Sequence, residues 1–201
     1  MKQNMRKRSP LAVLLALCLA VQLCVPAAMA SNRLMRAGDA AIAQIEEEEG
    51  FRAEKYSSGG KWYIGYGTEC GAEDYPEGIT REEAELLLMS KVEAYEAKLN
   101  DFFGRYDVTP TQGQFDALIC FSYNFGTGWM SGTSDLVKIA RGEKDATRLE
   151  VAHAFGEWCH SGGQAQAGLA DRRLQEAAIY LDDDTRAAEN EFAYLIINME
   201  S

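Results

Sequence analysis

The sequence predicts an α+β protein that is mainly helical, and two kinds of signal support this class. Turn glycines followed by aromatic and β-branched residues occupy positions 56–67, a pattern typical of a β-hairpin. Helix-start signals and spaced apolar residues recur from position 80 to position 181. About 170 of the 201 residues remain once an N-terminal leader is set aside, which is enough for one domain or two small lobes.

Positions 1–30 have the build of a signal peptide. The charged region of this leader contains four basic residues: Lys2, Arg6, Lys7 and Arg8. An apolar region follows from Leu11 to Val25, and Ala28-Met-Ala30 supplies small residues for cleavage before Ser31. The uncharged stretch over 9–32 is also long enough to span a bilayer, so an uncleaved anchor remains the alternative. We favour cleavage and expect a secreted or cell-envelope protein without stable membrane association.

The charge balance of the chain is acidic, with 31 acidic and 20 basic residues and a net charge of −11. Removal of the leader takes four basic residues with it, so 16 basic and 31 acidic residues remain, a net charge of −15. This balance argues against nucleic acid as a partner. The Cys and His residues do not have the spacing of a metal site, so we expect neither a metal nor another cofactor.

Three cysteines lie outside the leader. Cys120 belongs to an apolar run and is predicted to be a buried thiol. A disulfide between Cys70 and Cys159 would suit an oxidising exterior, but the spacing of these residues does not decide whether it forms.

The first predicted helix covers positions 40–50 and ends at a glycine. At about 100° per residue, Ile42, Ile45 and Glu49 share one face, whereas Glu48 points away from that face. Apolar surroundings and the neighbouring carboxylates are expected to raise the pKa of Glu49. A glutamate that stays protonated near neutral pH can act as a general acid. The alternative is that the whole run of glutamates is a solvated helix end.

The predicted hairpin follows this helix and turns at Gly59-Gly60. Three side chains share one face of its second strand: Trp62, Ile64 and Tyr66. Gly65 and Gly67 leave the opposite face bare, so another backbone or a sugar could approach it closely.

The remaining elements are predicted to be helices. Thr80 followed by Glu83 is a capping box, which opens a long helix that ends near Phe103. Pro110 is expected at the first position of the next helix, which ends near Asn124. Similar signals predict helices over 134–141, 145–158 and 169–181, a flexible loop over 162–168, and a tail over 182–201.

Several blocks in this chain resemble the phage-type lysozymes, the family-24 glycoside hydrolases. In order they are Glu49-Gly50, Tyr56, Ile64-Gly-Tyr-Gly67, Thr111-Gln-Gly-Gln-Phe-Asp-Ala-Leu118, Phe121-Ser-Tyr-Asn-Phe-Gly-Thr-Gly128, Trp158 and Gly168-Leu-Ala-Asp-Arg-Arg173. The resemblance covers roughly positions 41–181. It implies a lysozyme-like domain over 38–181, in which a long helix joins a hairpin lobe to a helical lobe. It also implies hydrolysis of the β-1,4 bond between N-acetylmuramic acid and N-acetylglucosamine in peptidoglycan.

The resemblance implies that Glu49 is the general acid. The family pattern places an Asp nine residues after this Glu and a Thr just before Ile-Gly, and those two catalytic positions are Ser58 and Tyr63 here. Both are weak bases at neutral pH. Glu69, which we expect to contact the substrate, and Glu73 are nearby carboxylates that could activate the attacking water instead. Assistance by the acetamide of the substrate is a further route.

The resemblance also implies a far wall for the saccharide cleft. We assign Tyr123 and Asn124 to that wall, as substrate-binding residues, and Phe121 and Phe125 to the core. Arg172 is expected either to pair with the catalytic glutamate or to lie on the surface.

The expected partner is the glycan strand of peptidoglycan, and we expect the protein to act as a monomer. Two other interpretations remain open. One is a catalytically weakened protein that binds the wall, and the other is a membrane-tethered phage endolysin.

Overall fold

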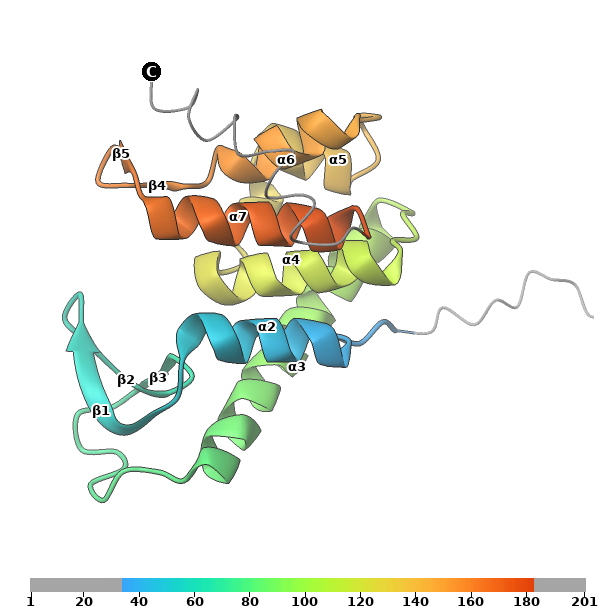
Figure 1. Ribbon diagram of the computed structural model, residues 1–201. Coiled ribbons are helices and arrows are strands. Elements are labelled where there is room, and N and C mark those ends of the chain that lie inside the picture. Colours follow the sequence, from blue (N-terminus) through green and yellow to red (C-terminus); the bar gives the residue numbers. More distant parts are fainter. Residues whose placement is uncertain (1–33, 183–201) are drawn as a thin grey trace, which may run out of the picture. The chain divides into compact units, whose positions relative to one another are not determined.

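The computed structural model describes residues 34–182, and the predicted signal peptide and almost all of the predicted tail lie outside these residues. In the described part, the elements follow this order (Figure 1): α2 Asp39–Glu49, β1 Arg52–Ser58, β2 Lys61–Gly65, β3 Thr68–Cys70, α3 Arg81–Arg105, α4 Gln112–Phe125, the 3-10 helix η1 Gly128–Ser131, α5 Asp135–Ala140, α6 Arg148–Gly156, β4 His160–Ser161, β5 Gln164–Ala165 and α7 Ala167–Tyr180. The predicted class, α+β and mainly helical, is confirmed. Between residues 34 and 182, no helix has both the length and the hydropathy needed to cross a membrane.

The strands β1, β2 and β3 form one antiparallel sheet in sequence order. Its first hairpin turns at Gly59 and Gly60, whose φ angles of +56° and +80° fit the two-residue turn that joins antiparallel strands. The predicted hairpin is therefore confirmed, but its second strand ends at Gly65, so Tyr66 lies beyond the strand and not on its face as predicted. Ile64 is fully buried, whereas Trp62, which lies closer to the turn, is 39% exposed.

The long helix α3 packs against both β2 and α4. It begins, as predicted, at a capping box in which the Thr80 hydroxyl accepts a hydrogen bond from the Glu83 N–H at 3.2 Å and the Glu83 carboxylate accepts one from the Thr80 N–H at 2.8 Å. A Cβ atom at Gly65 would lie only 3.0 Å from the Cβ of Ala84. The close approach predicted at Gly65 is thus made by this helix.

Helix α4 packs against α2, α3 and α7 (Figure 1). Its residues from Phe115 to Tyr123 are all buried, as expected for a helix covered on several sides. The start of the helix differs from the prediction. The Thr111 hydroxyl accepts a hydrogen bond from the Gln114 N–H at 3.2 Å, and the Gln114 side chain accepts one from the Thr111 N–H at 2.9 Å. This capping box sets the helix start, so Pro110 precedes the helix instead of occupying its first position.

Two later segments also differ from the prediction. Helix α6 begins at Arg148, directly after another capping box, rather than at Asp145. The segment 162–168, which was predicted to be a flexible loop, contains the turn between β4 and β5 and the start of α7. Gly162 and Gly163 have φ angles of +62° and +80°, which fit the same kind of turn as the first hairpin. Strands of two residues are too short to show alternation in the sequence.

The cysteines agree with one prediction and exclude the disulfide that the sequence left open. Cys120 is buried on α4, and burial raises the pKa of its thiol. Cys70 on β3 is a free thiol, so the disulfide between Cys70 and Cys159 is not formed in this structure.

Candidate active site

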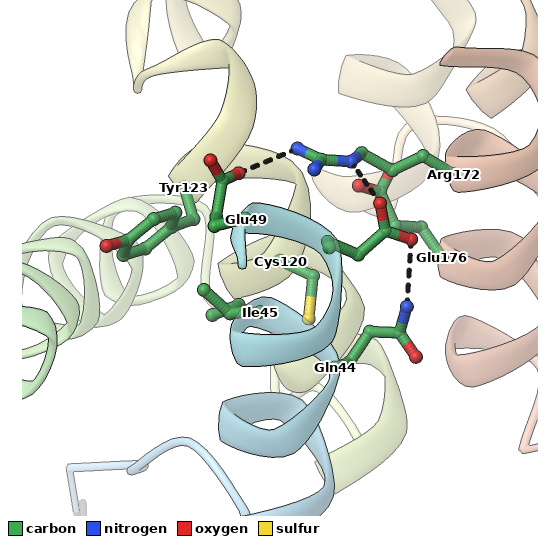
Figure 2. Close-up of a pocket in the computed structure, with 8 residues that line it drawn as sticks. Gln44, Ile45, Glu49, Cys120, Tyr123, Arg172 and Glu176 are labelled. Carbon is green, nitrogen blue, oxygen red and sulfur yellow. Dashed lines mark hydrogen bonds and ion pairs between the residues drawn. The ribbon is translucent and has the colours of Figure 1, made fainter. Parts of the chain in front are cut away.

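Glu49 is the last residue of α2, and Gly50 caps the helix with a φ angle of +66°. Ile45, one turn earlier, is buried, as the predicted helix face requires. The Glu49 side chain is 21% exposed, and its Oε1 accepts a hydrogen bond from Nη1 of Arg172 at 2.9 Å (Figure 2). Of the two alternatives for Arg172, the structure therefore shows the pairing with Glu49.

Glu48 also contacts Arg172. Its Oε2 accepts a hydrogen bond from Nε of Arg172 at 2.7 Å, and its Oε1 accepts one from Nε2 of Gln44 at 2.9 Å. Glu48 does point away from the apolar face of α2, but α7 covers the side to which it points. The interpretation of the whole glutamate run as a solvated helix end is therefore wrong for Glu48 and Glu49. Burial acts to lower the pKa of Arg172, but Glu49 and Glu48 outweigh it and the pKa is raised.

Gly67 lies against the second carboxylate oxygen of Glu49. A Cβ atom at position 67 would stand 2.9 Å from Oε2 of Glu49, and the φ angle there is +72°, so the position requires glycine. Lys91 of α3 donates a hydrogen bond to the Gly67 carbonyl oxygen at 3.3 Å, and its ammonium lies 3.7 Å from the centre of the Tyr123 ring. Burial lowers the pKa of Lys91, while Glu49 and Glu69 oppose this shift.

Tyr123 is buried beside Glu49, and its hydroxyl donates a hydrogen bond to the Tyr66 carbonyl oxygen at 2.7 Å. Burial raises the pKa of Tyr123, and the charge of Glu49 adds to this shift. Tyr123 and Glu49 line one pocket, whose full lining is Gln44, Ile45, Glu48, Glu49, Cys120, Tyr123, Arg172 and Glu176 (Figure 2). Tyr123 thus lies at the site, but as a buried wall whose hydroxyl is already bound to the backbone.

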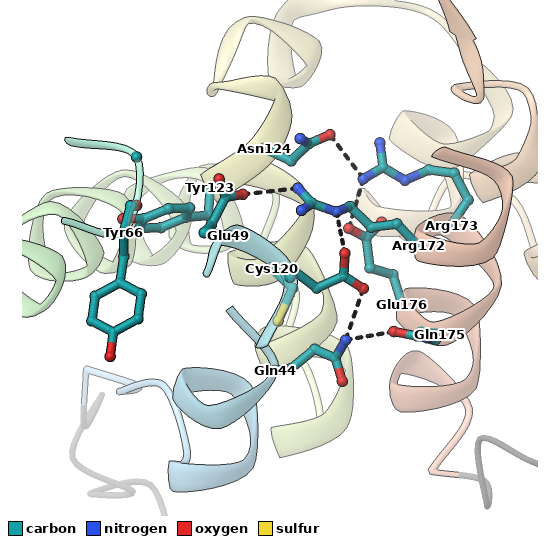
Figure 3. Close-up of polar contacts among 12 residues, drawn as sticks. Gln44, Glu49, Tyr66, Cys120, Tyr123, Asn124, Arg172, Arg173, Gln175 and Glu176 are labelled. Atoms are coloured by element: carbon teal, nitrogen blue, oxygen red, sulfur yellow. Dashed lines mark hydrogen bonds and ion pairs between the residues drawn. The ribbon is translucent and has the colours of Figure 1, made fainter. Parts of the chain in front are cut away.

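Asn124, which follows Tyr123, is exposed. It lines an open cavity of about 570 Å³ together with Glu48, Ser161, Gln166, Gly168, Leu169 and Arg172. The Oδ1 atom of Asn124 accepts a hydrogen bond from Arg173 at 3.1 Å (Figure 3). The assignment of Asn124 to the far wall of the saccharide cleft stays a prediction.

The two neighbouring phenylalanines have different positions. Phe121 is fully buried, as predicted. Phe125 was also assigned to the core, but 46% of it is exposed. It is the last residue of α4, and its ring stacks on Phe121 and makes a T-shaped contact with Trp158. The assignment failed because α4 ends here, where fewer elements cover the helix.

Two residues of the predicted site, Tyr63 and Glu69, lie on one face of the sheet together with Tyr56. Tyr56, Tyr63 and Glu69 are directly paired across β1, β2 and β3, so their side chains stand in a row. The rings of Tyr56 and Tyr63 are 5.7 Å apart, and Glu69 forms an exposed ion pair with Lys61 at 2.8 Å. Burial raises the pKa of Tyr56 and Glu49 contributes to the increase, which places this face within electrostatic reach of Glu49. Ser58 is exposed at the end of β1.

A buried ion pair lies behind the site, and the sequence analysis did not predict it. Nη2 of Arg173 donates to Oε1 of Glu176 at 2.7 Å, and both side chains are almost completely buried (Figure 3). Burial raises the pKa of Glu176 to about 8, although Arg173 opposes this shift. The three-residue spacing on a helix was the available signal, but it does not reveal burial.

Comparison with known proteins identifies the family to which this chain belongs. The sequence model of the family described as phage lysozyme matches residues 46–176. The chain belongs to the phage lysozyme family. The match includes Glu49, the hairpin and Arg172.

Solved structures of similar proteins have the same fold. The endolysin from Escherichia coli O157:H7 phage FAHEc1 is 32% identical, with a TM-score of 0.62 over 74% of this chain and 94% of that chain. The muramidase domain of SpmX from Asticaccaulis excentricus is 28% identical, with a TM-score of 0.59 over 73% of this chain and 97% of that chain.

Two curated relatives are endolysins of Bacillus phages. The protein of phage B103 is 33% identical over 161 residues, which is 78% of this chain and 58% of the relative. The protein of phage PZA is 36% identical over 150 residues, which is 73% of this chain and 55% of the relative. This member of the phage lysozyme family thus spans about half the length of the curated relatives it matches.

Proposed function

We propose that the protein is a peptidoglycan hydrolase, a muramidase that cleaves the β-1,4 bond between N-acetylmuramic acid and N-acetylglucosamine. The observation that carries this proposal is the environment of Glu49, whose two carboxylate oxygens have different neighbours. Oε1 is bound to Arg172 at 2.9 Å, and Oε2 lies over the bare backbone of Gly67. Membership of the phage lysozyme family and the similarity to endolysins and to a muramidase domain support the same activity.

In this mechanism Glu49 acts as the general acid. The protonated Oε2 gives its proton to the glycosidic oxygen while the bond from that oxygen to the anomeric carbon breaks. Glu49 becomes a carboxylate, and the positive charge of Arg172 stabilises it. A water oxygen bonds to the anomeric carbon and gives up a proton to a base. Arg172 therefore helps the acid to lose its proton as the bond breaks.

The base is the part of the family pattern from which this chain departs. Ser58 and Tyr63 stand at the expected positions, but a hydroxyl is a poor proton acceptor at neutral pH. Glu69 is the carboxylate on the same sheet face, and we propose it as the substitute base, with the substrate acetamide as the other route. The lack of a carboxylate at position 58 favours one second candidate function, a catalytically weakened protein that binds the wall.

Wall clearing by purified variants tests this proposal. Glu49→Gln is nearly isosteric and should lower the rate of clearing by about 10²–10⁴-fold, the usual loss for a general acid. Glu47→Gln is the matched control, because Glu47 belongs to the same helix end but is exposed. Equal losses from the two variants, or no loss from either, would refute the role of Glu49.

A zymogram on purified wall separates the second candidate function. A protein that only binds the wall leaves no cleared zone, however tightly it adheres.

A further inference from the structure

The guanidinium of Arg172 binds the carboxylates of two neighbouring residues of α2, Glu48 and Glu49. Its Nε atom binds Oε2 of Glu48 at 2.7 Å, and its Nη1 atom binds Oε1 of Glu49 at 2.9 Å (Figure 3). The side chains are largely enclosed, with 12% of Arg172, 20% of Glu48 and 21% of Glu49 exposed. Solvent therefore screens these contacts less than it screens a surface ion pair.

Glu48 is itself held in place. Its second oxygen accepts a hydrogen bond from Gln44 at 2.9 Å, and the same amide nitrogen of Gln44 also donates to Gln175 of α7 (Figure 3). Glu48 thus has one oxygen bound to its own helix and one bound to Arg172. Its orientation is fixed from two sides, so it can fix the orientation of the arginine in turn.

Because Arg172 binds both carboxylates, the two oxygens of Glu49 have different partners. A guanidinium prefers to bind a carboxylate with two parallel N–H bonds, which would engage both oxygens. Because Glu48 occupies Nε, the guanidinium meets Glu49 through Nη1 and Oε1. The other oxygen, Oε2, then stays available over Gly67 to carry a proton.

We propose that Glu48 is a positioning residue of the site: it holds Arg172 so that this arginine binds one oxygen of Glu49 and leaves the other for the transferable proton. This inference rests on the proposed function of Glu49 as the acid. Without Glu48, Arg172 would be free to turn toward Glu49 and bind both of its oxygens. Neither oxygen of Glu49 would then be left to deliver a proton to the substrate, so the catalytic step would slow.

Other charged or titratable groups also face the two glutamates. They are Arg172 and Glu176 from α7, Cys120 and Tyr123 from α4, Lys91 and Tyr95 from α3 and Tyr56 from β1. Glu48→Ala and Glu48→Gln remove the same charge from this group of residues. A difference in rate between the two variants can therefore be assigned to the hydrogen bond with Arg172.

The test compares Glu48→Ala with Glu48→Gln and with the exposed control Glu47→Ala. Glu48→Ala should lower kcat by about tenfold with KM within about twofold of the native value, as expected for a misplaced catalytic group. Glu48→Gln keeps an oxygen that accepts from Nε of Arg172, so it should retain at least about a third of the native kcat. Glu47→Ala should behave as the native protein.

The proposal is overturned if Glu48→Ala keeps kcat within about twofold of the native value. It is also overturned if Glu48→Gln loses as much activity as Glu48→Ala, since the loss would then not depend on the hydrogen bond. If Glu48→Ala does not fold, Gln44→Leu removes the contact that holds Glu48, together with the one to Gln175, and should lower kcat to a smaller degree.

A second measurement separates this proposal from the proposed function. The midpoints of urea unfolding are compared for Glu48→Gln, Glu49→Gln and the double variant, with no substrate present. Non-additive midpoints are expected because both glutamates share Arg172. Additive midpoints would show that the two glutamates are not coupled. Failure of the native protein to clear any wall would refute the proposed function, whatever the midpoints show.

Discussion

Replacement of Gly67 by alanine is the sharpest steric test of the site. The φ angle at this position is +72°, and the left-handed conformation costs an alanine about 1–2 kcal/mol. For a domain of this size, about 2–4 °C of melting temperature is lost per kcal/mol, so Gly67→Ala should lower the melting temperature by about 2–8 °C. This part of the effect concerns stability alone.

The second part of the effect concerns Glu49. The new Cβ atom would stand 2.9 Å from Oε2, whereas ordinary contacts begin at 3.4 Å, so the carboxylate must retreat by about 0.5 Å. A displacement of about 1 Å at a reacting group can cost 10²-fold in rate, so we expect about a tenfold loss of kcat from the folded enzyme.

Gly162→Ala is the matched control for Gly67→Ala. Gly162 has a similar φ angle of +62°, and a Cβ atom there meets nothing within 4 Å. Calorimetry should show comparable losses of melting temperature in the two variants, while turbidity assays of wall clearing should show a loss of rate for Gly67→Ala only. If both variants clear walls at the native rate, Oε2 of Glu49 does not occupy the position described here.

Three further predictions concern the base, the buried glutamate and the buried thiol. If the hairpin lacks an effective base, Ser58→Asp with Tyr63→Thr should raise the rate of hydrolysis by at least about tenfold, which corresponds to about 1.4 kcal/mol of barrier. If Glu69 already acts as the base, this double variant should gain nothing and Glu69→Gln should lose activity. Because burial raises the pKa of Glu176 from its ordinary value of 4.5 to about 8, the stability that this group contributes is fully present below about pH 4.5 and is lost as the pH rises through about 8. Glu176→Gln should therefore flatten the fall of melting temperature over this range, and an unchanged slope would contradict the assignment. Cys120 is 6% exposed and burial raises the pKa of its thiol, so peptide mapping after iodoacetamide treatment should find it unmodified in the folded protein and modified in denaturant.

The elements that were predicted well are those whose signals are local. The capping box at Thr80 and the turn at Gly59-Gly60 involve residues within a few positions of each other, and both are found in the structure. The start of α4 was misplaced because Pro110 and Thr111 gave competing local signals, and the complete capping box at Thr111 prevailed. The β4–β5 hairpin was missed because its strands have two residues each.

The site was predicted less completely, since its contacts join distant parts of the chain. The helix period correctly placed Ile45 and Glu49 on one face, but it could not show that α7 covers Glu48 on another. Arg172 lies 123 positions from Glu49, so the sequence could suggest this pair only through the family resemblance. The exposure of Phe125 depends on how many elements cover the end of α4, which is also a property of the tertiary structure.

The sheet offers a physical reason to prefer Glu69 over Ser58 as the base. Tyr56, Tyr63 and Glu69 are paired across the three strands and so present their side chains on one face, and Glu49 is within electrostatic reach of Tyr56. The ion pair of Glu69 with Lys61 is exposed to solvent, and such a pair does little to hold a carboxylate in place. Glu69 can therefore leave Lys61 for a water on this face without a large loss of stability. Ser58 lies on the same strand as Tyr56 but carries no group that accepts a proton at neutral pH. Glu69 on β3 would thus act as the base in place of the Asp of the family pattern, a role that Ser58 cannot fill here.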